Sequence, residues 1–466
     1  MSKLGLILRT TIHLKPIQLW FQVWRRIQKK FDPHPSCGSD ELPEFTFLNT
    51  TAKPKGWNDE SLELLWRYNL HYFDGLAAKN AECSKKCEGL VERWIDENPR
   101  GSFPGWDPYP TSLRIVNWVK WLNGNHADHV ERVEASLREQ VDWLMRHLEY
   151  HLLANHLLAN AKALVFAGKY FDRKDWYGKG MAIYHRQLPE QTCSDGANFE
   201  RSPMYHAIIF EDMLDLAEYT GGPIFKEYAA RMADGMRLLT APDGKIAKFN
   251  DSTEGIAKQP VELLARAEKF SRVEHAEHVE VGDDSGFLRM QAGDWVLLAK
   301  IGDVGPSYQP GHAHADTYSF ELWEGDKKVI GDTGCSTYIP GSIRTYERST
   351  KAHNTVVIDG QNSSEVWASH RVGRRFDSKQ HHREFELAES GLKGVDYLNG
   401  KGEHDVEVRF HLPPGVAKSD IAIDCPGELS WEACDFAEGW NLRKQGICAV
   451  YSSQLSFPAK IEWWIH

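Results

Sequence analysis

The chain has 466 residues, an ordinary 41% share of apolar residues and a formal net charge of −11. This length is too great for one core, so we expect two domains, or one large domain and a smaller one. The negative charge argues against a nucleic-acid partner, and the absence of a run of about 18 apolar residues predicts no transmembrane span.

Residues 1–59 are predicted to form a basic helix and a lead-in segment. The first 30 residues carry seven Lys and Arg and no acid. Their apolar side chains share one helical face: Ile17, Trp20, Val23, Trp24 and Ile27. Such a helix can rest on an anionic membrane surface, but the sequence favours docking on the protein's own acidic surface.

The first residues contain no feature that predicts export. The apolar stretch Leu4–Leu8 is too short for a signal-peptide core, and no small-residue cleavage site follows it. The eight Cys include no CxxC pair and fit no zinc module, which is typical of free thiols in a reducing compartment. We therefore expect a cytoplasmic protein, with peripheral membrane contact through the basic N-terminus as an alternative.

Residues 60–280 show helical periodicity. Leu137, Val141, Leu144 and Leu148 follow the spacing of one helix face, and similar runs recur along this segment. Loops rich in Pro, Gly and Asp separate the runs, so we expect helical hairpins arranged as a bundle, a solenoid or a toroid. The 17 Trp of the chain indicate an aromatic core for the most part, although a groove that stacks on sugar rings is an alternative.

Residues 281–466 change to a period of two. The runs "DWVLLAKIG", "TYSFELW", "NTVVIDG" and "VEVRFHL" are rich in β-branched and aromatic residues. No strong helical pattern intervenes, so we expect antiparallel sheets in a sandwich, with "IEWWIH" as the last strand. The predicted fold class is therefore multidomain α+β, with a helical domain followed by a sheet domain.

Asn155 and His156 stand where two helical patterns meet. An Asn at such a junction is a plausible helix cap. The pair can also be functional, and the residues alone leave both interpretations open.

A second polar group, in "FERSPMYH", contains Glu200, Tyr205 and His206. Ser202 followed by Pro203 is a conventional helix start, which places Tyr205 in the first turn. There the positive end of the helix dipole favours a tyrosinate or a bound anion. A catalytic Tyr and a Tyr packed under the cap both remain open.

A third group begins with "GHAHADTYSF". In an extended segment, His312, His314 and Asp316 point to one face. Asp332 and His353 follow in the next two segments, and two His with one Asp make a plausible zinc set with an open position. Spacing alone does not decide between catalysis and metal binding.

A fourth group, "SHRVGRR", forms a positive patch in a negatively charged chain. The guanidinium groups of Arg371, Arg374 and Arg375 suit a carboxylate or a sulfate. The alternative is a solvated strand edge that its charges protect from pairing.

Seven stretches in order, from about residue 60 to 375, together resemble the heparinase II/III family of polysaccharide lyases. They are "LWRYNLHYFDGL", "NHLLANAKAL", "FERSPMYH", "KFNDSTEGIA", "GHAHADTYSFEL", "DTGCSTY" and "RSTKAHNTVVIDGQNSSEVW". The resemblance implies an N-terminal incomplete (α/α) toroid, a C-terminal antiparallel β-sandwich and a site in the cleft between them. It also implies β-elimination on 4-linked uronic-acid polysaccharides, so the expected partner is an anionic polysaccharide or oligosaccharide.

The resemblance assigns roles to the first catalytic groups. Asn155 and His156 match the pair that holds the uronate carboxylate, while Tyr205 and His312 match the acid and base. Tyr338 is a possible further site Tyr, and we expect Glu200 and Arg371 to bind substrate.

The resemblance also implies a divalent metal that braces the site, zinc with calcium as the alternative. His314, Asp332 and His353 match its ligands. His312 and His314 would then divide their roles, and because strict alternation puts both on one face, this requires a local twist or bulge.

Other functions remain open on the same residues. A uronyl C5-epimerase would use the same enolate but return a proton to C5. A glycan-binding protein associated with polysaccharide biosynthesis would need no chemistry, and a metal hydrolase is less favoured because the expected metal is structural.

Overall fold

The computed structural model describes residues 3–31, 35–77, 81–124, 130–270, 279–281 and 284–466. Its contacts divide the chain into two compact units, which we call the helical unit and the sheet unit. The helical unit comprises Lys15–Pro189 and Asp215–Gly222, and the sheet unit comprises Met1–Leu14, Glu190–Leu214 and Pro223–His466. These units are not consecutive in sequence, whereas the predicted domains are. The change from helices to strands itself falls after residue 267, close to the predicted change of period.

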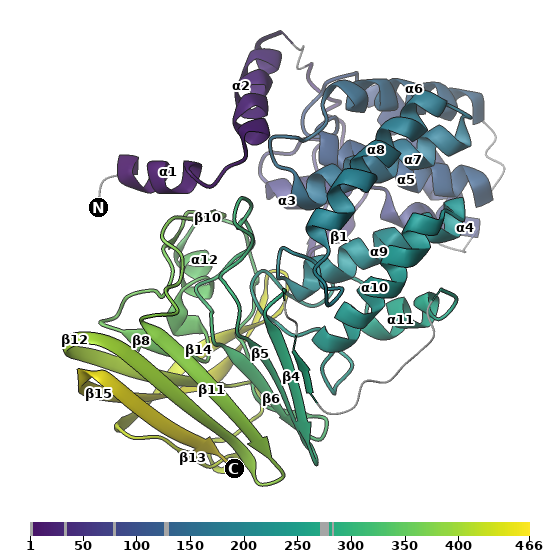
Figure 1. The fold of residues 1–466 in the computed structure, drawn as a ribbon. Coiled ribbons are helices and arrows are strands. Elements are labelled where there is room, and N and C mark those ends of the chain that lie inside the picture. Colours follow the sequence, from purple (N-terminus) through teal and green to yellow (C-terminus); the bar gives the residue numbers. More distant parts are fainter. Residues whose placement is uncertain (1–2, 32–34, 78–80, 125–129, 271–278, 282–283) are drawn as a thin grey trace. The chain divides into compact units, whose positions relative to one another are not determined.

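The helical unit consists mainly of helices, with one small β-hairpin (Figure 1). Its elements are α2 (Pro16–Phe31), β1 (Phe45–Phe47), β2 (Thr50–Ala52), α3 (Leu64–Leu70), α4 (Ala81–Glu97), α5 (Pro108–Gly124), α6 (Val130–Arg146), α7 (Ala154–Tyr170) and most of α8 (Lys174–Gln191). Among the described helices of the whole chain, none is both long and apolar enough to cross a membrane.

Aromatic side chains fill the core of the helical unit. The Trp94 ring lies 5.6 Å from Trp118, edge to face, and 5.9 Å from Trp106, stacked. All three are buried, as are most Trp of the chain. Large rings stabilise such a core because each removes much apolar surface from water. The expectation that most Trp serve packing is therefore confirmed.

A buried carboxylate links helices within this unit. Asp215 accepts hydrogen bonds from Lys162 Nζ at 2.6 Å and from Lys120 Nζ at 2.5 Å. Burial alone would raise the pKa of Asp215, but the two ammonium groups hold it below its usual range. The stabilising charge is therefore fully present above the unfolded-state pKa of about 3.9 and is lost as the pH falls below it.

We expect Asp215→Asn to lower the free energy of unfolding by about 3–5 kcal/mol at neutral pH, because Lys162 stays buried without its counter-charge. Lys120→Met is the matched control and should cost less, since the Lys120 side chain is 34% exposed. Urea unfolding measures both. An equal cost for the two variants at pH 7, or a cost for Asp215→Asn that does not shrink in acid, would contradict this account.

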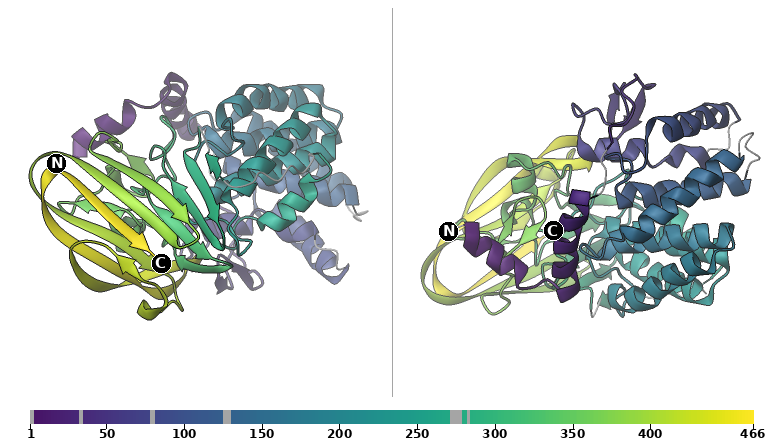
Figure 2. Two further views of the ribbon diagram at one scale, coloured as in Figure 1. Left: turned by 60° about the horizontal axis from the view of Figure 1, so that its bottom comes forward. Right: turned by 90° about the horizontal axis from the view of Figure 1, so that it is seen from above.

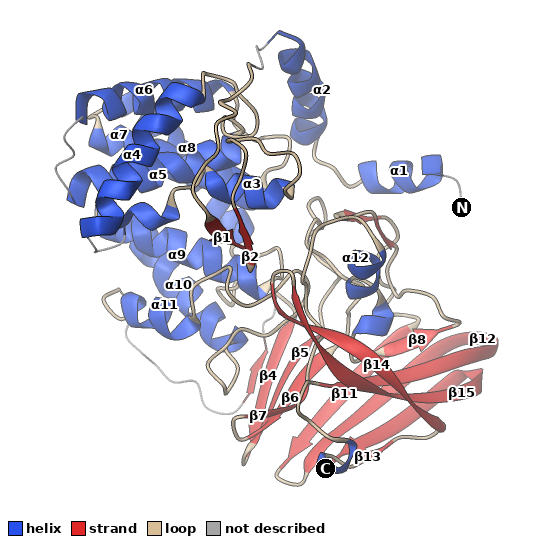
Figure 3. Ribbon diagram, turned by 180° about the vertical axis from the view of Figure 1, so that it is seen from behind, coloured by secondary structure: helices blue, strands red, loops and turns tan. Residues whose placement is uncertain are grey.

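The sheet unit contains the remaining elements (Figure 3). Its helices are α1 (Lys3–Thr11), α9 (Pro203–Thr220) for most of its length, α10 (Pro223–Leu239), α11 (Pro260–Ala267) and α12 (Ser342–Glu347). Its strands are β3 (Val279–Val281), β4 (Phe287–Ala292), β5 (Trp295–Lys300), β6 (Phe320–Glu324), β7 (Lys327–Ile330), β8 (Val356–Ile358), β9 (Val366–Trp367), β10 (Arg371–Val372), β11 (His381–Ala388), β12 (Gly391–Leu412), β13 (Ile423–Asp424), β14 (Glu428–Gly439) and β15 (Leu442–Ile465).

Two antiparallel sheets pack face to face in this unit, as two further views show (Figure 2). One has the order β3-β4-β5-β6-β7, and the other has the order β11-β12-β15-β13 with β14 and β8 paired to its long strands. Phe320 of the first sheet stacks on Trp463 of the second at 5.4 Å. The predicted strands therefore form a sandwich, and the last stretch "IEWWIH" ends β15.

Candidate active site

Helix α9 places Tyr205 in its first turn, as the sequence predicts. The helix begins at Pro203, and Ser202 Oγ accepts the backbone N–H of Tyr205 at 3.3 Å. This is a helix cap of the kind that Ser provides. The neighbouring His206 is a core residue, because its ring bonds the backbone N–H of Asn198 and the carbonyl of Met232, and burial lowers its pKa to about 4.

The segment 311–319, which we call the histidine loop, is not the extended strand entrance that the sequence predicts. Strand β6 begins only at Phe320. Residues 318 and 319 pair with Lys300 at the end of β5, but side chains take backbone groups earlier in the loop: the N–H of His314 donates to Asn250 Oδ1 at 2.8 Å, and Arg348 donates to the carbonyl of Ala313 at 2.8 Å. Polar side chains therefore replace the ladder that an extended segment would need.

Both histidine rings of this loop turn to one carboxylate. His312 Nδ1 lies 3.0 Å from Asp251 Oδ2, and His314 Nε2 lies 2.8 Å from Asp251 Oδ1. The loop departs from strict alternation, as the predicted division of roles requires, although one acid binds both rings. Their remaining ring nitrogens have different surroundings, so different roles are still compatible with this geometry.

Asp251 is the centre of the cluster, although sequence reasoning did not single it out. Besides the two imidazoles it binds the Arg344 guanidinium through both oxygens, with Nη2 at 2.9 Å. Burial alone would raise the pKa of Asp251, but Arg344 and the two imidazoles hold it well below its usual range. An ionised Asp251 accepts the Nδ1–H of His312, which leaves Nε2 of that ring for proton transfer.

Tyr205 lies against His312 in the sheet unit. The two rings stack with centroids 3.8 Å apart, and Tyr205 Oη lies 3.1 Å from Tyr338 Oη. Removal from water, Asp251 and Tyr205 raise the pKa of Tyr338 well above its usual range, so Tyr338 stays protonated and can donate to Tyr205. Glu200, which is buried, places Oε2 3.5 Å from His312 Nε2.

Two arginines from one short helix hold the neighbouring loops. Arg344 in α12 and Arg348 directly after it are one helical turn apart. Arg344 donates to the carbonyl of Ser369 at 2.7 Å, and Arg348 donates to that of Ala368 at 2.9 Å. Both therefore fix the segment before His370, whose ring lies 4.9 Å from that of Tyr338.

The predicted metal residues lie together in the sheet unit. Among the residues that the structure describes, buried Nδ1 of His314 and buried Nε2 of His353 have no hydrogen-bond partner, and the two rings are 5.4 Å apart. Burial lowers the pKa of His314 to about 4, so its lone pair is available at neutral pH. Asp332 Oδ2 lies 2.9 Å from His353 Nδ1. A carboxylate that fixes the tautomer of a histidine is the usual partner of a metal ligand, and these residues therefore fit a metal.

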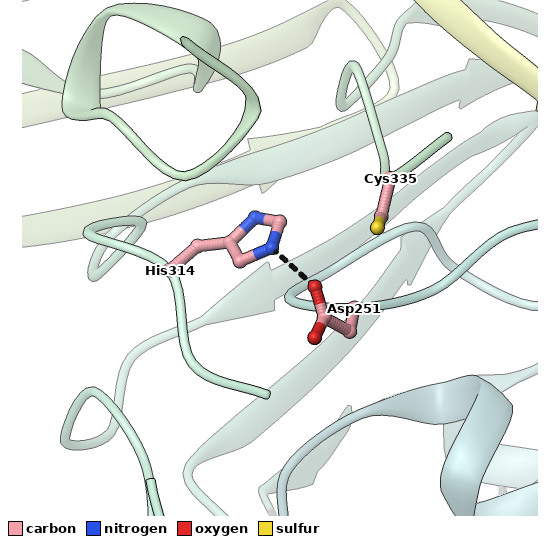
Figure 4. Close-up of side chains that lie close together, drawn as sticks. All are labelled: Asp251, His314 and Cys335. Atoms are coloured by element: carbon pink, nitrogen blue, oxygen red, sulfur yellow. Dashed lines mark hydrogen bonds and ion pairs between the residues drawn. The ribbon is translucent and has the colours of Figure 1, made fainter. Parts of the chain in front are cut away.

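Asp251, His314 and Cys335 also bring ligand-type atoms within 4.8 Å of one another (Figure 4). This set does not fit a metal. Arg344 Nη1 donates to Cys335 Sγ at 3.2 Å and also binds Asp251, so a cation already neutralises the acid. Burial raises the pKa of the Cys335 thiol well above its usual range, which disfavours the thiolate that binds metals.

Asn155 and His156 lie in the helical unit, in the first turn of α7. The cap interpretation of Asn155 is wrong, because the helix begins at Ala154. Leu153 and Ala154 have φ of 63° and 49°, a region that costs free energy for residues other than Gly and that concentrates at functional sites. His156 Nδ1 lies 3.1 Å from Glu149 Oε1, so a carboxylate orients this ring as well.

The arginines of the predicted positive patch have different surroundings. Arg375 pairs with Asp303 at 2.8 Å and donates to two loop carbonyls. Arg371 lies in the short strand β10 and is exposed. Its predicted contact with substrate stays a prediction.

Two family models match consecutive parts of the chain. The heparinase II/III N-terminus matches residues 118–272, and the C-terminal heparinase II/III-like model matches residues 274–381. Two curated relatives, each named heparin-sulfate lyase, are 22% identical over 64% of this chain (Bacteroides stercoris) and 24% identical over 49% of it (Pedobacter heparinus). The chain spans half the length of the first relative and 39% of the second.

A crystal structure of heparinase III superposes with a TM-score of 0.67 and 17% identity, covering 88% of this chain and 77% of that one. Together with the helices and the paired sheets, this likeness confirms the predicted fold class, an incomplete (α/α) toroid followed by an antiparallel β-sandwich.

Proposed function

The chain belongs to the heparinase II/III-like family, and on that premise we propose that it is a polysaccharide lyase that cleaves a 4-linked, uronate-containing anionic glycan by β-elimination. The observation that supports this most is that the rings of Tyr205 and His312 stack with centroids 3.8 Å apart. The hydroxyl of Tyr338 contacts Tyr205, and the carboxylate of Asp251 contacts His312. The names of the two relatives make heparan-sulfate-type oligosaccharides the first substrates to test.

The reaction needs a base, an acid and a group that stabilises negative charge. A base removes the proton at C5, the charge spreads into the carboxylate as an enolate, and an acid protonates O4 as the C4–O4 bond breaks. The product carries a C4–C5 double bond. We assign proton transfer to Tyr205 Oη and His312 Nε2, and the configuration at C5 decides which of them is the base.

The partners of this pair support those roles. A hydrogen bond from Tyr338 stabilises Tyr205 when its oxygen carries negative charge. Asp251 keeps a proton on His312 Nδ1 by accepting its hydrogen bond. Nε2 is then the nitrogen that gains or loses a proton in the reaction. Glu200 near that nitrogen stabilises a protonated ring, and it is also the proposed contact to substrate hydroxyl groups.

The remaining substrate contacts rest on the family pattern and on residue chemistry. We assign the uronate carboxylate to Asn155 and His156, because an amide and an imidazole can donate hydrogen bonds to a growing enolate. Arg371 is exposed and can bind a sulfate or a second carboxylate.

The activity assay separates three functions. The protein is incubated with uronate oligosaccharides in deuterated buffer, and ultraviolet absorbance reports the unsaturated product. A lyase raises the absorbance and yields shorter fragments. Deuterium at C5 without an absorbance rise would show an epimerase instead, and neither signal across a broad glycan panel would leave binding as the function.

We also propose that His314 Nδ1 and His353 Nε2 bind a divalent metal, with Asp332 orienting the His353 ring through its other nitrogen, and zinc suits such imidazole ligands best. Such an ion would brace the histidine loop against the segment before β8, and it would take no proton in the reaction.

We expect His353→Ala to lose the bound metal and to lower the melting temperature, and a chelator to reproduce that shift in the wild type but not in the variant. Elemental analysis and thermal unfolding measure this. His411→Ala is the control, because His411 is equally buried but has backbone and amide partners. Unchanged metal content in His353→Ala, or equal metal loss in the control, would contradict the assignment.

A further inference from the structure

The largest concentration of exposed apolar side chains lies outside the site, on the first two helices. In the described residues, nine of seventeen exposed large apolar side chains fall within residues 4–27. They are Leu4, Ile7, Leu8, Ile12, Leu19, Trp20, Val23, Trp24 and Ile27. Exposed patches of this kind indicate an interaction surface.

Helix α2 docks on the helical unit with its polar face. Gln18, which is fully buried, donates to the carbonyl of Leu152, and Gln28 donates to that of Arg146 at 3.0 Å. Arg25 Nη1 lies 2.6 Å from His151 Nε2. The helix therefore docks as the sequence favours, but its apolar stripe is on the side that faces water.

Helix α1 shows the same inversion in the sheet unit. Arg9 pairs with Glu365 at 2.7 Å, and Thr10 donates to the carbonyl of Val372 at 3.2 Å. Leu4 and Leu8, one turn apart on the other side, are 67% and 60% exposed. An amphipathic helix normally buries its apolar stripe, so two inverted helices in succession indicate a partner that covers them.

The charge of this segment indicates what the partner is. Residues 1–30 carry seven Lys and Arg and no acid, in a chain whose net charge is −11. Lys3 and Arg26 are exposed beside the apolar stripes. Trp and Leu on one face with basic residues beside them is the composition of a helix that lies in the interface of an anionic bilayer, where indole rings are favoured.

We propose that α1 and α2 bind an anionic lipid surface, each inserting its own exposed apolar side chains among the acyl chains, with Lys3 and Arg26 at the headgroups. A protein partner would equally cover apolar side chains, but it gives no reason for a segment of 30 residues without one acid. A second copy of this chain that paired segment to segment would bring two positive segments together, and they would repel each other. The proposal does not depend on the lyase activity.

The test uses the full chain and sedimentation with vesicles of phosphatidylcholine, alone or with phosphatidylglycerol. We expect sedimentation with the anionic vesicles, weakened by salt. Trp20→Ser/Trp24→Ser should lower the partition coefficient by roughly tenfold or more, because two large apolar groups are removed. Lys3→Glu/Arg26→Glu should remove the preference for the anionic vesicles.

The control is Val261→Ser/Leu442→Ser, which removes two other exposed apolar side chains, 69% and 45% exposed. It should sediment like the wild type, and circular dichroism should show all variants folded. No sedimentation of the wild type, or equal sedimentation of the Trp variant, would overturn the proposal. So would light scattering that shows a wild-type dimer which the Trp variant converts to a monomer, because the partner would then be a second copy.

Discussion

Tyr205→Phe is expected to lower turnover of a uronate oligosaccharide by roughly 10²–10⁴-fold while the protein stays folded. The substitution removes one oxygen and keeps the ring that stacks on His312 at 3.8 Å. What is lost is the hydroxyl that bonds Tyr338 and that we assign to proton transfer. The measurement is the initial rate of the ultraviolet absorbance rise, with thermal unfolding alongside.

Tyr451→Phe is the matched control for this prediction. Tyr451 is buried in β15 and donates to the carbonyl of Ile423 at 2.7 Å, so its variant also loses one hydroxyl and one hydrogen bond within the sheet unit. We expect a small loss of stability and unchanged turnover. If Tyr205→Phe keeps wild-type turnover, or if both variants lose activity alike, Tyr205 is not a proton-transfer group.

The sequence predicts those parts of the site that rest on local rules. Ser202–Pro203 is a helix start by itself, so the position of Tyr205 in the first turn follows from neighbouring residues. The runs rich in β-branched and aromatic residues give the strands for the same reason, and β5 and β6 are buried almost throughout, as strands of a sandwich core are.

The centre of the cluster is not local, which is why Asp251 escaped sequence reasoning. Its partners His312, His314 and Arg344 are 61, 63 and 93 residues away along the chain. No periodicity connects an acid in one loop with an arginine in a later short helix. An isolated Asp followed by Ser and Thr looks like an ordinary turn residue.

For the histidine loop, the local pattern predicted an extended strand entrance, but the structure has a loop. Alternation of His and Ala in "GHAHAD" fits an extended segment, but alternation is decisive only where a neighbouring strand takes the backbone groups. Here the side chains of Asn250 and Arg348 take two of these groups, at 2.8 Å each. The side chains that decide the backbone of this loop are therefore far from it in sequence.

Asp251→Asn is expected to have the largest combined effect, lowering turnover by roughly 10²–10⁴-fold and the free energy of unfolding by about 3–5 kcal/mol. The amide keeps the shape of the carboxylate but loses its charge, so buried Arg344 has no counter-charge. The two oxygens of Asp251 accept hydrogen bonds from His312 and His314, but the NH₂ group of Asn would stand in place of one oxygen and is itself a donor. At least one histidine ring would therefore turn away or change its tautomer.

The acid dependence of the stability loss gives a second measurement. Because the folded pKa of Asp251 is well below the unfolded value, its charge stabilises the fold fully above about pH 4–5 and progressively less as the pH falls. The difference in unfolding free energy between wild type and Asp251→Asn should therefore be largest near neutral pH and shrink in acid. A difference that stays constant with pH would show that the charge is not what the fold uses.

Asp396→Asn separates catalysis from stability, because the chain contains a second constellation of the same kind. Asp396 is buried and binds Arg383 through both oxygens, at 2.7 and 2.8 Å, and His381 at 2.7 Å. These partners lie within the sandwich and do not include Tyr205 or His312. We expect a comparable loss of stability with normal turnover per folded molecule. If Asp251→Asn likewise kept normal turnover per folded molecule, Asp251 would be an anchor of the fold only, and the orientation of His312 would not depend on it.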